Sequence, residues 1–219
     1  MTEQRLVLLI SGRGSNLRAI QQACTSGQLP ARITAVISNR ADAAGLAWCR
    51  DARLAAEVIA HKNFSTRADF DRALAAAIDT HNPDWIVLAG FMRQLTDAFV
   101  QRYLGRLINI HPSLLPAFPG LHTHQQALQA GVRWHGASVH FVTPELDAGP
   151  IIAQGVLPVR SDDTPESLSA RVLALEHELY PQALGHLLRG DCVLEQGQTR
   201  WRQAYQSPDL ASINPQRQA

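Results

Sequence analysis

Residues 107 to 120 read Leu107-Ile108-Asn109-Ile110-His111-Pro112-Ser113-Leu114-Leu115-Pro116-Ala117-Phe118-Pro119-Gly120, an apolar run that breaks into a loop punctuated by proline and glycine. The apolar run is typical of the end of a buried strand. Side chains alternate between the two faces of a strand, so Asn109 and His111 should point the same way. Open α/β sheets bind ligands at the carboxyl ends of their strands, which makes this polar pair a candidate site. The plain alternative is a hydrogen-bonded Asn and His that close a turn, because Asn-x-His alone is a weak signal.

Other apolar runs recur along the chain, each followed by a helical pattern. They lie at 6–10, 33–37 and 85–89, with a weaker run at 55–59. Runs without polar alternation indicate strands that are buried on both faces, as in parallel sheets. The intervening helices are expected to be capped by Asp42, by Ser65 or Thr66, and by Thr96. Strands alternating with helices predict an α/β fold with a doubly wound, mostly parallel sheet.

The pattern changes after the proline-rich loop. Two β-rich segments, 135–142 and 151–159, are joined by a tight polar loop and predict an antiparallel hairpin at one edge of the sheet. Thr164 followed by Pro165 predicts the start of a long helix, because proline favours the first helical position. Gly190 marks the expected end of that helix.

Composition excludes several classes of partner. The chain has 219 residues, of which 46% are hydrophobic, and its 20 basic and 19 acidic residues leave a net charge of +1. Nucleic-acid and membrane-surface binding would call for a basic patch, so neither is expected. The three cysteines are far apart and lack metal-ligand spacing, which together with a polar start predicts reduced thiols in a cytoplasmic protein.

A glycine-rich turn follows the first apolar run and reads Ser11-Gly12-Arg13-Gly14-Ser15-Asn16. A strand, a glycine-rich turn and a helix together make an anion-binding arrangement, because glycines let the backbone approach the ligand and the helix start offers free N–H groups. The turn is not a dinucleotide fingerprint, since the third glycine would fall at Leu17. A simple tight turn between strand and helix is the alternative.

Asn109, His111 and Asp147 together suggest acyl chemistry. An asparagine donates hydrogen bonds, a histidine can donate a proton, and an aspartate in a Gly/Pro loop can hold that histidine and raise its pKa. Such a set stabilises an oxyanion at an acyl carbon. No Gly-x-Ser-x-Gly elbow is present, and Ser113 lies between Pro112 and Leu114, so acyl transfer directly to an amine is favoured over a covalent intermediate.

Histidines near the candidate site raise a metal alternative. His111, His122, His124, His135 and His140 cluster in sequence, and His-x-His can chelate zinc. No HExxH or cysteine-rich pattern accompanies them, so no metal is expected.

Four motifs together resemble the folate-dependent phosphoribosylglycinamide formyltransferase family. They are Ser11 to Asn16, Leu88-Ala89-Gly90-Phe91-Met92-Arg93, Asn109 to Pro116, and Glu145-Leu146-Asp147-Ala148-Gly149-Pro150, in the family's order. The resemblance covers roughly Arg5 to Trp201. It implies transfer of the formyl group of the co-substrate 10-formyltetrahydrofolate to the primary amine of 5-phosphoribosylglycinamide.

The resemblance also implies roles for individual residues. Asn109 and His111 would stabilise the oxyanion, with Asp147 raising the His111 pKa. Ser138 and His140 would contact these catalytic residues and not the substrate. The substrate phosphate and ribose would be held by Gly12, Arg13, Gly14, Ser15, Asn16 and Glu176. The folate pocket would be lined by Arg67, Met92, Arg93, Gln94, Leu95, Asn109, Thr143, Pro144, Glu145, Leu146 and Asp147.

The same resemblance implies one formyltransferase domain over residues 1–205. A ribonucleotide-binding half would span about 1–105 and a folate-binding, catalytic half about 106–205, with 206–219 as a loose tail. Only small-molecule partners are expected, in a monomer or homodimer. Two alternatives remain: a formyltetrahydrofolate deformylase, in which water replaces the amine, and a folate- or nucleotide-binding module without catalysis. The first would carry an additional N-terminal domain, and the second would be expected to lack one of the trio.

Overall fold

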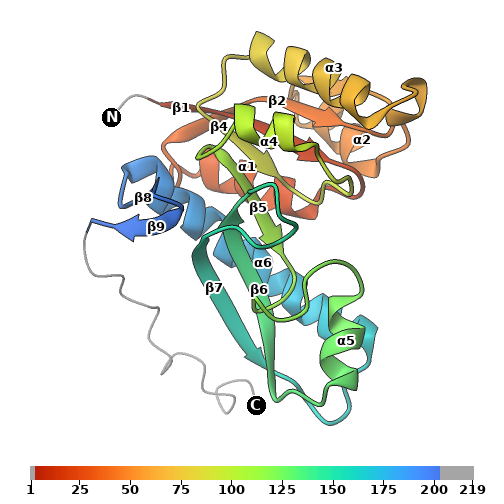
Figure 1. Cartoon of the computed structure of the whole chain (residues 1–219), viewed down its shortest axis with the longest axis vertical. Coiled ribbons are helices and arrows are strands. Elements are labelled where there is room, and N and C mark those ends of the chain that lie inside the picture. The colour runs from red at the N-terminus through yellow and green to blue at the C-terminus, as the bar shows by residue number, and fades with distance from the viewer. Residues whose placement is uncertain (1–2, 203–219) are drawn as a thin grey trace.

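A computed structural model describes residues 3–202, and its main feature is a seven-stranded sheet with helices on both faces (Figure 1). The strand order is β3-β2-β1-β4-β5-β6-β7. Strands β1 to β5 run parallel, whereas β6 and β7 are antiparallel to their neighbours. The bounds are β1 Gln4–Ile10, β2 Ala31–Ser38, β3 Ala56–Val58, β4 Trp85–Leu88, β5 Leu107–His111, β6 Trp134–Phe141 and β7 Ile151–Pro158. The predicted doubly wound sheet and its antiparallel edge are confirmed.

Two hydrophobic cores explain why β1 reads as an unbroken apolar run. Leu6, Leu8 and Ile10 pack into one core with α1, α2 and α6, while Val7 and Leu9 pack into the other with α3 and α4. All five side chains are fully buried. The helices are α1 Ser15–Thr25, α2 Ala44–Asp51, α3 Arg67–Thr80, α4 Asp97–Arg102, α5 Thr123–Gln129 and α6 Pro165–Arg189, with a short 3-10 helix η1 at His61–Asn63. Burial on both faces is the expected state of a central parallel strand.

The helix starts follow the predicted capping residues with one exception. Thr66, Thr96 and Thr164 each accept a bond from the backbone of the first turn. The prediction that Asp42 caps the second helix is wrong: α2 begins after Ala43 without a side-chain cap. The Asp42 carboxylate is instead held by two hydrogen bonds from Arg40, at 2.9 and 2.7 Å, and is drawn away from the helix start.

The two directions of winding diverge at β1. The chain leaves β1 towards β2 on one side, and β4 pairs with β1 on the other side. At their carboxyl ends the backbone N–H of Ser11 donates to the carbonyl of Gly90 at 3.0 Å. Such a switch point is where open α/β sheets leave room for ligands.

A small hairpin, β8 Cys192–Glu195 and β9 Gln198–Trp201, follows α6 and lies against β7. The expected loose tail at 206–219 lies outside the described residues. Among residues 3–202, no helix has the length and apolar character needed to cross a bilayer.

Candidate active site

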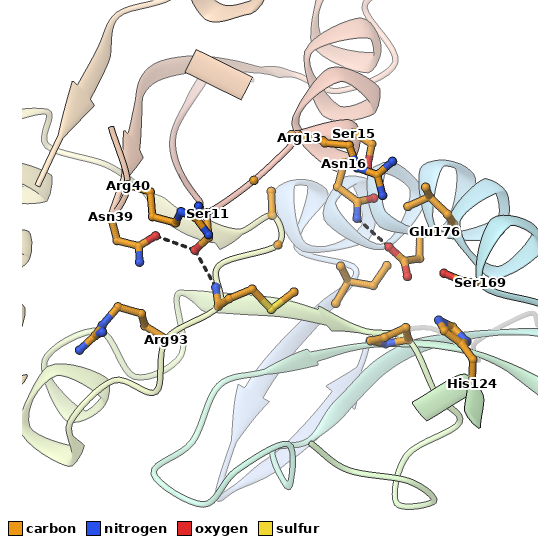
Figure 2. Close-up of a pocket in the computed structure, with 18 of the residues that line it drawn as sticks. Ser11, Arg13, Ser15, Asn16, Asn39, Arg40, Arg93, His124, Ser169 and Glu176 are labelled. Atoms are coloured by element: carbon orange, nitrogen blue, oxygen red, sulfur yellow. Dashed lines mark hydrogen bonds between the residues drawn. The ribbon is translucent and has the colours of Figure 1, made fainter. Parts of the chain in front are cut away.

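Two adjoining cavities open at the carboxyl ends of the parallel strands. The larger has a volume of about 640 Å³ and is lined by the glycine-rich turn, by Glu176 of α6 and by the ends of β2 and β4 (Figure 2). The smaller has a volume of about 110 Å³ and lies between the segment after β4 and the 143–147 loop. Arg93 lines both cavities, so they share a wall.

The glycine-rich turn forms the anion-binding end of the larger cavity. Gly14 precedes α1 with a φ of 72°, a left-handed conformation that suits glycine. A Cβ at Gly14 would lie 3.2 Å from the Cα of Gly45, whereas a Cβ at Gly12 would meet nothing within 4 Å. The backbone of Gly12 is therefore open to a ligand, next to the positive end of the α1 dipole.

Glu176 joins this cavity from the opposite helix. The amide nitrogen of Asn16 donates to Glu176 Oε2 at 2.7 Å, as Figure 2 shows. Burial raises the pKa of Glu176 to about 7, and the hydrogen bond from Asn16 opposes that rise. All six residues predicted for the ribonucleotide line this one cavity, although Asn16 and Glu176 are far apart in the chain.

The predicted folate residues separate into three groups. Arg93, Gln94, Leu95, Asn109 and the whole of 143–147 line the smaller cavity. Met92 lines the larger cavity instead. Arg67 is the exposed first residue of α3 and is absent from the lining of both cavities.

The polar face predicted on β5 continues onto β6. Asn109 pairs with His140 and His111 with Ser138 in the antiparallel register. Asn109 Nδ2 lies 3.2 Å from His140 Nε2. Asn109 has a second amide hydrogen, which is available to a ligand in the smaller cavity that this residue lines.

Asp147 reaches His111 from the loop between β6 and β7. Asp147 Oδ2 lies 3.4 Å from His111 Nδ1 and accepts a hydrogen bond from the Gly120 N–H at 2.9 Å. The other ring nitrogen of His111 lies 2.9 Å from the carbonyl oxygen of Phe118. Both ring nitrogens thus face acceptors, and only the doubly protonated imidazolium can donate to both. His111 is 5% exposed and is absent from the lining of both cavities.

Ser138 fixes the proline-rich loop that follows β5. Its hydroxyl donates to the carbonyl of Ser113 at 2.8 Å and accepts from the N–H of Leu115 at 3.0 Å. The Leu115–Pro116 peptide bond is cis. Ser113 is fully buried and donates to the carbonyl of Ala117 at 2.6 Å, so its hydroxyl has no access to a substrate.

His140 lies beneath the trio as a neutral ring. Burial lowers its pKa, so the uncharged form is favoured. Its Nε2 lies 3.9 Å from Asp147 Oδ1 as well as within reach of Asn109. His140 therefore lies next to both Asn109 and Asp147, two members of the proposed catalytic trio.

Several lining residues of the larger cavity were missed by the sequence analysis. Asn39 and Arg40 follow β2, His61 follows β3, and His124 is the second residue of α5. His61 Nδ1 lies 2.8 Å from the backbone oxygen of Asn39. The available signal was Asn39, a polar residue directly after a parallel strand, which places it at the same edge as Ser11 and His111.

The histidine cluster does not assemble into a metal site. His124 Nδ1 lies 3.2 Å from His135 Nε2, and burial lowers the pKa of His135 to about 4. Within residues 3–202, no three His, Cys, Asp or Glu side chains come together to hold a metal ion.

Comparisons with known proteins agree with this geometry. The family model for formyl transferase matches residues 4–184. Phosphoribosylglycinamide formyltransferase of Escherichia coli is 50% identical over 185 residues, which covers 84% of this chain and 87% of that protein. The solved structure of phosphoribosylglycinamide formyltransferase from Coxiella burnetii matches with a TM-score of 0.87 at 50% identity, over 91% of this chain and 93% of that one.

A formyltetrahydrofolate deformylase from Pseudomonas syringae is a more distant match. Its TM-score is 0.84 at 27% identity, and the match covers 91% of this chain but 66% of the deformylase. The identity therefore favours the transferases over the hydrolase. The chain belongs to the formyl transferase family and, within it, to the phosphoribosylglycinamide formyltransferases.

Proposed function

We propose that this chain transfers the formyl group of 10-formyltetrahydrofolate to the primary amine of 5-phosphoribosylglycinamide, a step of purine biosynthesis. The observation that carries the proposal is the end of β5, which contributes to both cavities: Asn109 lines the smaller, whereas Ile110 and Pro112 line the larger. Two substrates bound side by side would meet at these residues. Proximity of this kind supplies a large part of the rate enhancement in group transfer.

The larger cavity would take the ribonucleotide. Its phosphate would accept hydrogen bonds from the backbone around Gly12 and from the start of α1, with the Arg13 guanidinium adding positive charge. The Glu176 carboxylate would accept hydrogen bonds from the ribose hydroxyls. The amine would then extend towards the end of β5.

The smaller cavity would take the folate. Its volume of about 110 Å³ holds only part of the molecule, so the rest of the bound folate would extend out of the cavity opening. Met92 and Leu146, which are 72% and 57% exposed, offer apolar contacts outside. The formyl group would lie beside Asn109.

The reaction would proceed by direct attack. The amine nitrogen bonds to the formyl carbon, and the carbonyl electrons move onto oxygen to give a tetrahedral intermediate. The free Asn109 amide hydrogen and the His111 imidazolium stabilise this oxyanion. His111 exchanges its longer contact, the 3.4 Å one to Asp147, for the reacting group. The bond to folate nitrogen then breaks, that nitrogen gains a proton from His111, and the amine loses one to Asp147 through water.

A single assay tests this proposal. Purified protein is given 10-formyltetrahydrofolate with and without 5-phosphoribosylglycinamide, and release of deformylated folate is followed by absorbance. Release that depends on the ribonucleotide is expected, and a chelator should leave the rate unchanged. Release without it would identify a deformylase, no release in either case would identify a binding module, and inactivation reversed by zinc would establish a metal enzyme.

The Glu176 pKa predicts how ribonucleotide binding depends on pH. With a pKa of about 7, the side chain is mostly neutral at pH 6 and mostly ionised at pH 8. A carboxylate accepts hydrogen bonds from hydroxyls more strongly than the neutral acid does. The KM for the ribonucleotide should therefore fall several-fold between these pH values in the unmodified chain.

Glu176→Gln is the control for that pH dependence, because the substrate phosphate also titrates near pH 6. The variant should have a higher KM at pH 8 and should retain only the part of the pH dependence that comes from the phosphate. The stability effect has a defined sign: a raised pKa means that the folded chain loses stability as pH rises from about 4.5 to about 7. Glu176→Gln should thus raise the Tm more at pH 8 than at pH 5. An equal KM shift at every pH would contradict the role given to the carboxylate.

The remaining parts of the proposal concern partners and organisation. We expect small-molecule substrates only, a cytoplasmic enzyme, and a monomer or homodimer. The division into a ribonucleotide-binding half and a catalytic half agrees with the sides of the site that 12–16 and 109–147 occupy, although Glu176 crosses that division. The roles of Arg67 and of the other folate residues stay predictions.

A further inference from the structure

The segment from Gly90 to Thr96 forms a wall of both cavities without being part of a helix or strand. Phe91, Gln94 and Leu95 line the smaller cavity, Gly90 and Met92 line the larger, and Arg93 lines both. The segment connects β4 to α4, and Gly90 has a φ of 80°. Its shape cannot come from a sheet or helix ladder, so other bonds must hold its backbone.

Ser11 holds the beginning of this segment. Its N–H donates to the Gly90 carbonyl at 3.0 Å, and its hydroxyl accepts from the Met92 N–H at 2.8 Å. The same hydroxyl donates to Asn39 Oδ1 at 2.6 Å, and Figure 2 shows both hydroxyl contacts as dashed lines. Because the proton is given to Asn39, the oxygen lone pairs are directed at Met92. Ser11 and Asn39 are 5% and 3% exposed, so water does not compete for these bonds.

Asp71 holds the end of the segment. It lies on α3, is 3% exposed, and its Oδ2 accepts from the Thr96 N–H at 2.6 Å. Thr96 is the residue that caps α4. The second carboxylate oxygen, Oδ1, is buried and has no hydrogen-bond partner among the described residues. A bond from a backbone N–H to a carboxylate is stronger than one to a neutral acceptor.

We propose that Ser11 and Asp71 are positioning residues for the folate co-substrate, which act by fixing the Gly90–Thr96 segment at both ends. This inference rests on the proposed folate site and extends it to two side chains for which no ligand contact is proposed. Ser11 is the first residue of the anion-binding turn and lines the larger cavity, so it also ties the wall of the folate cavity to the ribonucleotide loop. Without either anchor, the segment would spend part of its time in shapes that do not bind folate, and the apparent affinity would fall by that fraction.

Ser11→Ala is the main test, read through the two KM values. The substitution removes two hydroxyl bonds, of which the one from Met92 holds the segment, and loss of one internal hydrogen bond corresponds to about a five- to tenfold effect. We expect the KM for 10-formyltetrahydrofolate to rise by about that factor, whereas the ribonucleotide KM should change less than about threefold because its proposed ligands remain. Asp71→Leu should act in the same direction. Asp71→Asn should have a smaller effect than Asp71→Leu, since its amide oxygen still accepts from Thr96, although less strongly than the carboxylate does.

Thr34→Val is the matched control for loss of a hydroxyl. Thr34 donates to the Leu6 carbonyl at 3.1 Å within the sheet and does not appear in the lining of either cavity. Its Tm should fall by less than that of Ser11→Ala, which loses two bonds instead of one, and both KM values should be unchanged. This comparison separates positioning from general stability.

Calorimetric binding of a stable formyl-folate analogue gives a second readout that does not require turnover. The dissociation constant should rise in Ser11→Ala and Asp71→Leu by the same factor as the KM. Unchanged folate affinity, or equal rises in both KM values, would overturn the positioning role. If the unmodified chain bound the analogue but did not formylate the ribonucleotide, the proposed function would fail while the affinity ratio between variants would still decide this inference.

Discussion

Replacing His111 with alanine should lower kcat about a thousandfold while changing both KM values little, because general acid catalysis contributes about 10²–10⁴. The split follows from the geometry. The imidazole is buried behind the cavity walls and lines neither cavity, so its removal should leave ground-state binding nearly intact. What is lost is a proton donor and a positive charge that act on the oxyanion and the leaving nitrogen. Steady-state kinetics with both substrates measures the effect.

His81→Ala is the control for that experiment. His81 also contacts a carboxylate, with its Nε2 2.6 Å from Glu57 Oε1, but it lies at the end of α3, away from both cavities. This variant should keep kcat within about twofold, as expected for a surface pair of small energetic weight. A His111→Ala enzyme with near-normal turnover, or with a loss confined to KM, would remove the catalytic role proposed here.

The sheet could be predicted from sequence because burial on both faces leaves a direct mark. Residues 6–10 point alternately into two cores, and each position must therefore be apolar. The polar face of β5 was equally readable, since Asn109 and His111 are two residues apart on a strand. His140 and Ser138, which the resemblance placed beside the trio, lie opposite these two residues in register on β6.

Contacts between distant segments left no such mark. Asn16 and Glu176 meet because α1 packs on α6, and no local pattern in either helix encodes that pairing. The resemblance to a family supplied Glu176, whereas Asn39 and His61 were missed because they follow strands whose order in the sheet was unknown. Asp42 shows the opposite error: a good capping residue was assigned to a helix, but a neighbouring arginine competes for its carboxylate.

Asp147→Asn should lower kcat about a hundredfold or more, because it removes the carboxylate that faces His111 and that accepts the amine proton in the proposed reaction. The backbone of Asp147 has a φ of 50°, which asparagine tolerates, so the exchange should leave the loop in place. The amide oxygen would take the place of Oδ2 and keep both the bond from the Gly120 N–H and the contact with His111 Nδ1, while the NH₂ group would take the place of Oδ1, on the side of His140. The positive ring would then lack the negative charge that stabilises it, and the amine would lose the carboxylate that accepts its proton.

The split between kcat and KM distinguishes this explanation from a role in folate binding. In the unmodified chain His111 faces a carboxylate, whereas in Asp147→Asn it would face a neutral amide oxygen. The loss should therefore fall on kcat, with the KM for 10-formyltetrahydrofolate changed little. Asp51→Asn, at the exposed end of α2, makes the same chemical change outside both cavities and should leave both values unaltered. A loss confined to that KM would mean that Asp147 acts on the folate alone, because it also lines the folate cavity.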